Sequence, residues 1–204
     1  MNIRSIFLWA ALLALLSGCQ STSIRSAWFD TDFTGPPLRK ILVSASVSGS
    51  AEGRIVEDIF VEKLRAAGVD AIAGHGARLD DPGLADASFD AAVANTGAQG
   101  LLLVSLLGVD TRTQVSTTMV HGGMAWGRGT WGWGSATRTM VPVQEVRQYD
   151  IATVETKLFD VKTKQLVWAA TTSTFNPRSV ARESPAFADL IIGQLASRGI
   201  IAAK

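Results

Sequence analysis

The chain has 204 residues and almost no net charge, with 19 Lys and Arg against 18 Asp and Glu. Nucleic-acid-binding proteins carry a surplus of basic residues on one surface, and since no window of this sequence has one, nucleic acid is not an expected partner. The same argument excludes a polybasic patch for anionic lipid. The length suits one compact domain of about 160 residues with a short additional segment.

The N-terminal segment predicts where the protein works. Arg4 precedes an apolar run over residues 6–16, which ends in Leu16-Ser17-Gly18-Cys19. A basic start, a short apolar core and small residues before a cleavage site are typical of a secretory signal, and the run is too short for a membrane-spanning helix. Residues 1–18 are therefore predicted to be a signal peptide. Cys19 is the only cysteine, so a disulfide within the chain is impossible.

The segment Leu16-Ser17-Gly18-Cys19 resembles the lipobox of bacterial lipoproteins. The resemblance implies cleavage before Cys19 and acylation of its sulfur and its new amine. Gln20 follows where lipoproteins retained at the inner membrane usually have aspartate. The expected location is the periplasmic face of the outer membrane, and the membrane is the first expected partner, through the lipid anchor.

Residues 19–37 are predicted to be the lipidated cysteine and a tether, which closes with Gly35-Pro36-Pro37. Its aromatic residues, Trp28, Phe29 and Phe33, either dock on the folded domain or lie at the lipid headgroups. An extended tether of this length reaches roughly 60 Å from the membrane. Residues 38–204 are predicted to form the periplasmic domain.

Within that domain, β-branched runs and helical spacing of apolar residues alternate. Gly68 and Gly97 stand where glycines end helices, and Ser184-Pro185 is a candidate start for the last helix. An apolar phase shift between Ile151 and Val154 suggests a β-bulge. The predicted elements are strand 40–47, helix 52–67, strand 69–72, helix 88–95, strand 101–107 with an exposed continuation over 109–115, strand 143–160, strand 166–170 with Leu166, Trp168 and Ala170 on one face, and a closing helix over 184–195.

The order strand-helix-strand-helix-strand-strand-strand-helix predicts an α/β fold. Helices pack on a mixed, largely antiparallel sheet in a single domain.

Three stretches resemble a group of envelope lipoproteins. They are the strand-helix opening over residues 40–68, the entry Gly97-Ala98-Gln99-Gly100, and the run 153–160 followed by Leu166-Val167-Trp168. The group includes the amino-terminal domain of the Tol-system propeller protein, the penicillin-binding-protein activator lipoprotein, the curli-secretion lipoprotein and many lipoproteins of unknown function. The resemblance implies a binding or assembly role and brings no catalytic residues.

The sequence motifs that could carry chemistry do not predict an enzyme. Residues 127–132 match the glycine pattern of dinucleotide-binding proteins, but they lie among tryptophans between two strands, where the required helix is absent. His75 and His121 each stand beside glycine without a second ligand at metal spacing. The adjacent carboxylates Asp80 with Asp81 and Glu57 with Asp58 are expected to point apart or into water. No catalytic residue, metal, nucleotide or other cofactor is predicted.

The segment 120–136 combines many glycines with Trp126, Trp131 and Trp133. Ordering glycine-rich backbone and exposing tryptophans both cost free energy, so a partner surface or packing on the domain is expected. Three interpretations stay open. The tip folds back on the sheet, or it presents aromatic anchors to an envelope protein or glycan, or it dips into the membrane as in the pore-forming insertions of the curli lipoprotein.

The predicted function is that of a non-enzymatic, outer-membrane-anchored lipoprotein that binds or helps assemble cell-envelope partners. An oligomeric secretion or pore component, as in the curli-secretion lipoprotein, is the alternative. An envelope hydrolase is a weaker one. The expected site residues are Cys19 for lipidation and Trp126, Trp131 and Trp133 for partner binding.

Overall fold

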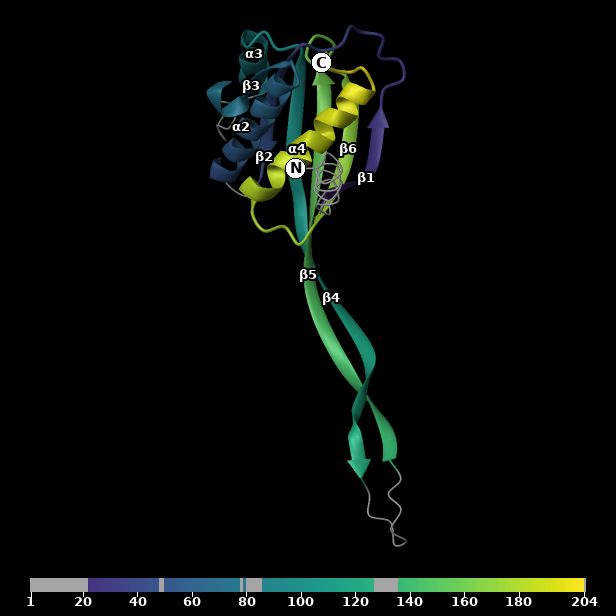
Figure 1. Cartoon of the computed structure of the whole chain (residues 1–204). Coiled ribbons are helices and arrows are strands. Elements are labelled where there is room, and N and C mark those ends of the chain that lie inside the picture. The colour runs from purple at the N-terminus through teal and green to yellow at the C-terminus, as the bar shows by residue number, and fades with distance from the viewer. Residues whose placement is uncertain (1–21, 48–49, 78, 80–85, 127–135, 204) are drawn as a thin grey trace, which may run out of the picture.

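A computed structural model describes residues 22–47, 50–77, 79, 86–126 and 136–203 of the chain. They form one six-stranded mixed sheet with three helices packed on it (Figure 1). The strands are β1 (Thr22–Phe29), β2 (Lys40–Ser46), β3 (Asp70–Ala73), β4 (Gly100–Trp126), β5 (Ala136–Asp160) and β6 (Leu166–Phe175), and the helices are α2 (Ser50–Ala66), α3 (Asp86–Asn95) and α4 (Val180–Ser197), with a short 3-10 turn η1 (Gly74–Ala77).

The sheet order is β1-β6-β5-β4-β2-β3. Strand β2 runs parallel to β3 and β4, while β4, β5, β6 and β1 pair antiparallel in succession. The predicted α/β class, the mixed and largely antiparallel sheet and the single domain are confirmed. Gly68 and Gly97 have φ of 88° and 65°, the left-handed conformation that glycine adopts without steric cost at a helix end.

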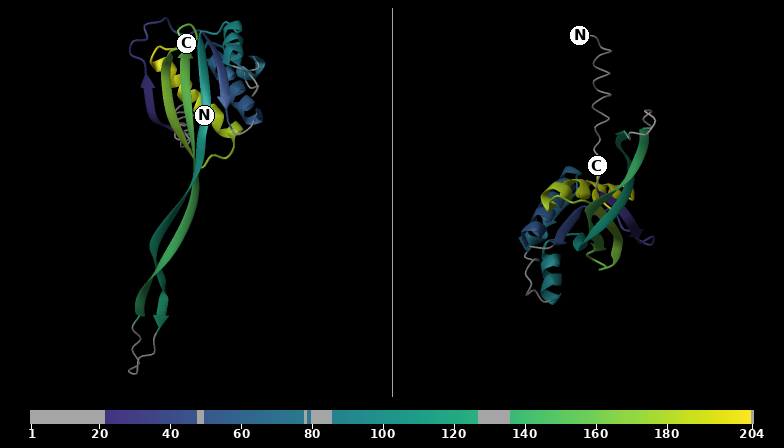
Figure 2. Two further views of the ribbon diagram at one scale, coloured as in Figure 1. Left: turned by 180° about the vertical axis from the view of Figure 1, so that it is seen from behind. Right: turned by 90° about the horizontal axis from the view of Figure 1, so that it is seen from below.

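Two apolar layers cover the two faces of the sheet. Helices α2 and α4 pack on one face over Ile41, Val43 and Leu102, and helix α3 packs on the other over Leu42 and Leu101. Neighbouring strand residues therefore enter different layers, as the alternation of side chains in a strand requires. The view from below separates α4 from α3 by the thickness of the sheet (Figure 2).

The predicted tether is wrong over the part that forms a strand of the sheet. Residues 22–29 form β1, which pairs antiparallel with β6 at the edge of the sheet. Most side chains of β1 are exposed, and its sequence has no apolar run of the kind that predicts a strand. Main-chain pairing with β6 places β1 in the sheet. Phe33 packs against the core and the Arg198 guanidinium lies 4.1 Å from the Phe29 ring centre, which confirms docking for these two, while Trp28 stays 51% exposed.

Two bulges shift the predicted strand faces. The irregularity predicted between Ile151 and Val154 is present at this level of the sheet, but its extra residue is Leu107 on the partner strand β4. A second shift lies at the start of β6, where Leu166 pairs with Phe159 and Trp168 with Leu158. Leu166 and Trp168 thus face opposite layers, because the inserted Val167 reverses the alternation.

Helix α4 begins earlier than predicted. Ser179 is its N-cap, with extended backbone and a side-chain oxygen that accepts a hydrogen bond from the Arg182 N–H at 3.3 Å, and Pro185 lies inside the helix. Ser184-Pro185 resembles a helix start because proline suits the first helical position. Ser179 and Ser184 are both candidate N-caps. Val180 packs on the core, and this favours a helix that begins after Ser179.

One buried hydroxyl offers a test of the core. Thr156 on β5 is 0% exposed, and its Oγ1 has no hydrogen-bond partner in the described part of the chain. Burying an unpaired hydroxyl costs free energy, and valine has the same shape without it. We expect Thr156→Val to raise the free energy of unfolding by about 1 kcal/mol in urea titrations, with the surface change Thr113→Val as control. A loss of stability would mean that the hydroxyl has a partner, such as a buried water.

Candidate functional site

The most prominent feature is a ribbon of two strands that leaves the sheet (Figure 1). Pairing of β2 with β4 ends at Ser105, and pairing of β6 with β5 ends at Ile151. Beyond them, among the described strands, residues 110–126 of β4 pair only with β5, and residues 136–150 of β5 pair only with β4. At about 3.3 Å per residue, the ribbon extends roughly 50 Å from the domain. We call these residues the ribbon.

The two faces of the ribbon differ in chemistry. Paired residues share a face, so the register assigns every described side chain. One side, the aliphatic face, consists of Thr111, Thr113, Val115, Thr117, Met119, Gln144, Val146, Gln148 and, at its base, Asp150. The other, the charged face, consists of Asp110, Arg112, Gln114, Ser116, Thr118, Glu145, Arg147 and Tyr149.

Charge pairing on the ribbon agrees with this division. On the charged face, Glu145 accepts a hydrogen bond from Arg147 Nε at 2.8 Å, which raises the pKa of the arginine. On the aliphatic face, the Asp150 carboxylate accepts the Thr111 hydroxyl at 2.7 Å. Val115, Met119 and Val146 are each about 60% exposed. Apart from Asp150 at its base, the described part of this face is uncharged, and its apolar side chains are open to contact.

An apolar groove of about 340 Å³ continues the aliphatic face at the base of the ribbon. The pair Val109 and Ala152 lies just outside the ribbon, on the side of the domain. Both residues line the groove, together with Leu106 and Val154. The start of α4 contributes Val180 and Phe187, and α2 contributes Val56. The polar lining residues include Asp150, Arg178 and Glu183. Since the walls come from several elements distant in sequence, no local pattern could have predicted the groove.

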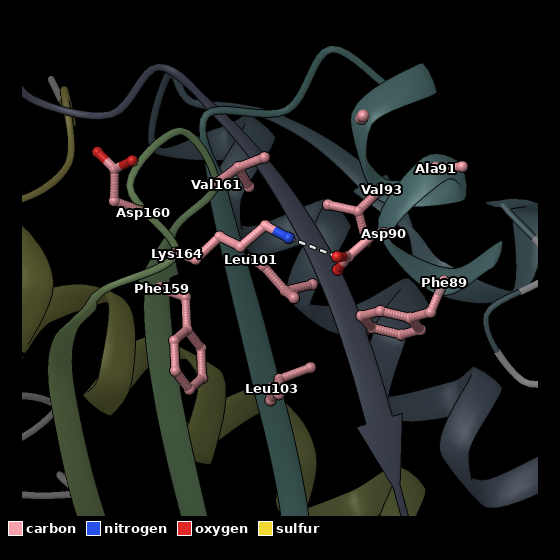
Figure 3. A pocket seen from close by; sticks show the side chains of 11 residues that line it. Phe89, Asp90, Ala91, Val93, Leu101, Leu103, Phe159, Asp160, Val161 and Lys164 are labelled. Atoms are coloured by element: carbon pink, nitrogen blue, oxygen red, sulfur yellow. Dashed lines mark hydrogen bonds and ion pairs between the residues drawn. The ribbon is translucent and has the colours of Figure 1, made fainter. Parts of the chain in front are cut away.

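A second hollow, of about 510 Å³, lies between α3 and the sheet (Figure 3). Phe89 and Val93 from α3 line it with Leu101 and Leu103 from β4. Lys164 forms an ion pair with Asp90 beside it. Its apolar walls are part of the packing of α3 on the sheet, whose small cluster includes Leu42, Val93 and Leu101.

The structure places His75 against the carboxylates of α2, so the prediction that Glu57 and Asp58 point apart or into water is wrong for the buried Glu57. Its Nδ1 lies 2.8 Å from Glu57 Oε2, and its Nε2 lies 3.6 Å from Asp58 Oδ1. Glu57 is 2% exposed and accepts the backbone N–H groups of Ala45 and His75 at 2.9 and 2.8 Å. The carboxylate thus ties the end of β2 to the turn after β3.

Gly74 makes room for this cluster. A Cβ at position 74 would lie 2.9 Å from the Val43 carbonyl oxygen and 3.0 Å from Glu57 Oε1, closer than packed atoms approach. Sequence reasoning missed the cluster because Glu57 and His75 are 18 positions apart and meet only when α2 packs on β2 and β3. Neither residue lines the groove or the hollow under α3, and the Glu57 carboxylate joins the backbone of Ala45 to that of His75.

The other predicted site residues are placed only in part. Cys19, Trp131 and Trp133 lie outside the described residues, as do Asp80 and Asp81. The backbones of His121 and Trp126 belong to β4 near the far end of the ribbon. In the described ranges no group of three or more His, Cys, Asp or Glu side chains could hold a metal ion. No described helix is long and apolar enough to cross a bilayer.

Comparison with known proteins finds no matching family model and no matching curated protein. Among solved structures, the PelC dodecamer from Paraburkholderia phytofirmans is similar with a TM-score of 0.47 and 14% identity over 90% of this chain and 99% of that chain. Lipoprotein GNA1162 from Neisseria meningitidis has a TM-score of 0.41 and 10% identity over 78% and 98%. A PDZ domain protein from Parabacteroides distasonis has 0.38 and 7% over 90% and 38%. Similarities of this size assign neither a family nor a function.

Proposed function

We propose that this chain is a lipid-anchored protein of the bacterial cell envelope that binds or helps assemble envelope partners through its ribbon, and that it is not an enzyme. The main observation in support of this proposal is the ribbon itself. No other described strand pairs with residues 110–126 or 136–150, and a two-stranded ribbon alone is at best marginally stable in water. A partner that covers the ribbon would supply the missing contacts.

The short distance in sequence between the proposed anchor and the sheet supports a partner at the membrane. The anchor is proposed at Cys19, from the lipobox-like Leu16-Ser17-Gly18-Cys19, and β1 begins at Thr22. Only two residues separate Cys19 from the sheet. Thr22 pairs with Thr174, close to where the ribbon departs, so the start of β1 and the ribbon share one end of the sheet (Figure 1). The partner then lies at or in the outer membrane rather than deep in the periplasm.

Site-specific photo-crosslinking in intact cells tests the proposal. A photoreactive residue at Val115 or at Val146, which are paired on the aliphatic face, is expected to give the same protein adduct. Ser116, the neighbour on the charged face, is the matched control and should give a much weaker adduct. Lys162, in the turn at the opposite end of the domain, should give none.

The alternative function, an oligomeric secretion or pore component, is favoured by one observation. Both strands of the ribbon have unpaired outer edges, which are templates for pairing with another chain. If this alternative holds, the adducts at Val115 and Val146 join copies of this chain and form a ladder in detergent extracts. Ribbon positions that give no protein adduct at all would contradict both functions.

A further inference from the structure

The groove lies beside the first residue of the sheet. One row of paired residues crosses four strands, from Thr22 on β1 through Thr174 and Ala152 to Val109 on β4. Thr22 Oγ1 and Thr174 Oγ1 are 2.9 Å apart. Thr174, Ala152 and Val109 all line the groove, so its wall is one strand away from Thr22, about 5 Å.

The segment before Thr22 is short. Cys19 precedes Thr22 by three residues, and three residues span at most about 10 Å. Wherever the segment points, an acyl chain attached to Cys19 begins within reach of the groove mouth. The long tether expected from the sequence would have allowed the anchor to be far away, and β1 excludes this.

The groove has the chemistry of an acyl-chain site. Most of its walls are aliphatic side chains and Phe187, and both of its carboxylates accept hydrogen bonds, Asp150 from the Thr111 hydroxyl and Glu183 Oε1 from the Arg178 backbone N–H. Uncovered apolar walls are unfavourable in water. An acyl chain that leaves the bilayer exchanges one apolar environment for another, so the net gain is the wall area removed from water.

We propose that one acyl chain carried by Cys19 occupies this groove while the other chains stay in the membrane. Two chains suffice for stable anchoring, and a groove of about 340 Å³ is at the small end of ligand sites, so it holds one chain rather than three. The lipid then also docks the domain and fixes the end of the sheet that bears the ribbon against the bilayer. This inference rests on the lipidation in the proposed function.

A photoreactive fatty acid tests the proposal in the full-length lipoprotein. Cells are fed a palmitate analogue with a diazirine near its methyl end and irradiated, and the purified protein is digested and analysed by mass spectrometry. The expected result is a crosslink between the Cys19 peptide and peptides that contain Leu106, Val154 or Val180. Leu106→Trp, which fills the groove, should abolish it.

Leu107→Trp is the matched control, because Leu107 is 59% exposed and does not line the groove. Val109→Trp changes an exposed residue at the mouth of the groove. It should also abolish the crosslink, without a change in the core. Crosslinks from Cys19 to phospholipid alone, or groove peptides that carry only phospholipid, would overturn the acyl-chain site and leave the proposed function intact. A Cys19 peptide without acyl mass would overturn both.

Discussion

Trp168→Ala is expected to lower the free energy of unfolding by about 4 kcal/mol, the range measured for large-to-small changes at buried aromatic residues. Trp168 is 0% exposed and stands on β6 opposite Leu158, in the layer covered by α2 and α4. Removing the indole leaves a cavity in the largest core cluster. Domains of this size have about 5–15 kcal/mol in total, so the variant loses a large part of its stability.

Trp168→Phe is expected to lower the free energy of unfolding less than Trp168→Ala, because it removes the unpaired indole N–H but keeps an aromatic ring. Trp168 Nε1 has no hydrogen-bond partner among the described residues, and phenylalanine removes this unpaired donor while filling much of the space. A loss of about 1–2 kcal/mol is expected for Trp168→Phe. The measurement is urea unfolding followed by circular dichroism, with Trp28→Ala, at a residue 51% exposed, changing stability by less than about 0.5 kcal/mol. Equal losses for Trp168→Phe and Trp168→Ala would show that the indole N–H is satisfied.

Glu57→Ala is expected to lower the free energy of unfolding by about 3 kcal/mol. The change leaves the part-buried N–H groups of Ala45 and His75 without their acceptor, and an unsatisfied donor away from water costs about 1–3 kcal/mol. Glu57→Gln keeps one carbonyl oxygen but turns an NH2 group toward donors, so its loss should be intermediate.

Asp58→Ala is the control for Glu57. Asp58 is the next residue on α2, its side chain is 66% exposed, and its contact with His75 is 3.6 Å, so we expect a change below about 0.5 kcal/mol. Urea titrations at constant m-value report all three variants. If Glu57→Ala and Asp58→Ala had the same small effect, the carboxylate would not organise the ends of β2 and β3.

The sheet end with the ribbon and the first strand concentrates the features that the proposals use. The aliphatic face, the groove and the start of β1 lie there. The hollow under α3 is lined in part by the turn between β5 and β6, and this turn lies at the other end of the sheet (Figure 1). A lipid anchor three residues before β1 would hold this end toward the membrane. The ribbon is then presented to partners at the bilayer surface, which is how the anchor and the ribbon would act together.

Local patterns were sufficient for the order of elements from β2 to α4. The apolar runs at Ile41 and Leu101 are buried strands because parallel and central strands are covered on both faces, and the turns at Gly68 and Gly97 need a conformation that glycine favours. The exposed continuation over 109–115 and the long strand over 143–160 were predicted from alternation of polar and apolar residues, which persists outside the core, but the full length of the ribbon, to Trp126 on β4 and from Ala136 on β5, was not.

What tertiary structure decided is where residues distant in sequence meet. Strand β1 has few buried side chains and exists because its main chain completes the edge of β6, so hydrophobic patterning could not reveal it. Glu57 and His75 come together only when α2 packs on the sheet, and the groove needs walls from β4, β5, β6, α2 and α4 at once. The sequence by itself determined the fold class and the proposed lipidation at Cys19, because propensities and cleavage motifs are local. The position of Thr22, at the start of β1, beside the groove and the ribbon was decided by strand pairing, which is non-local.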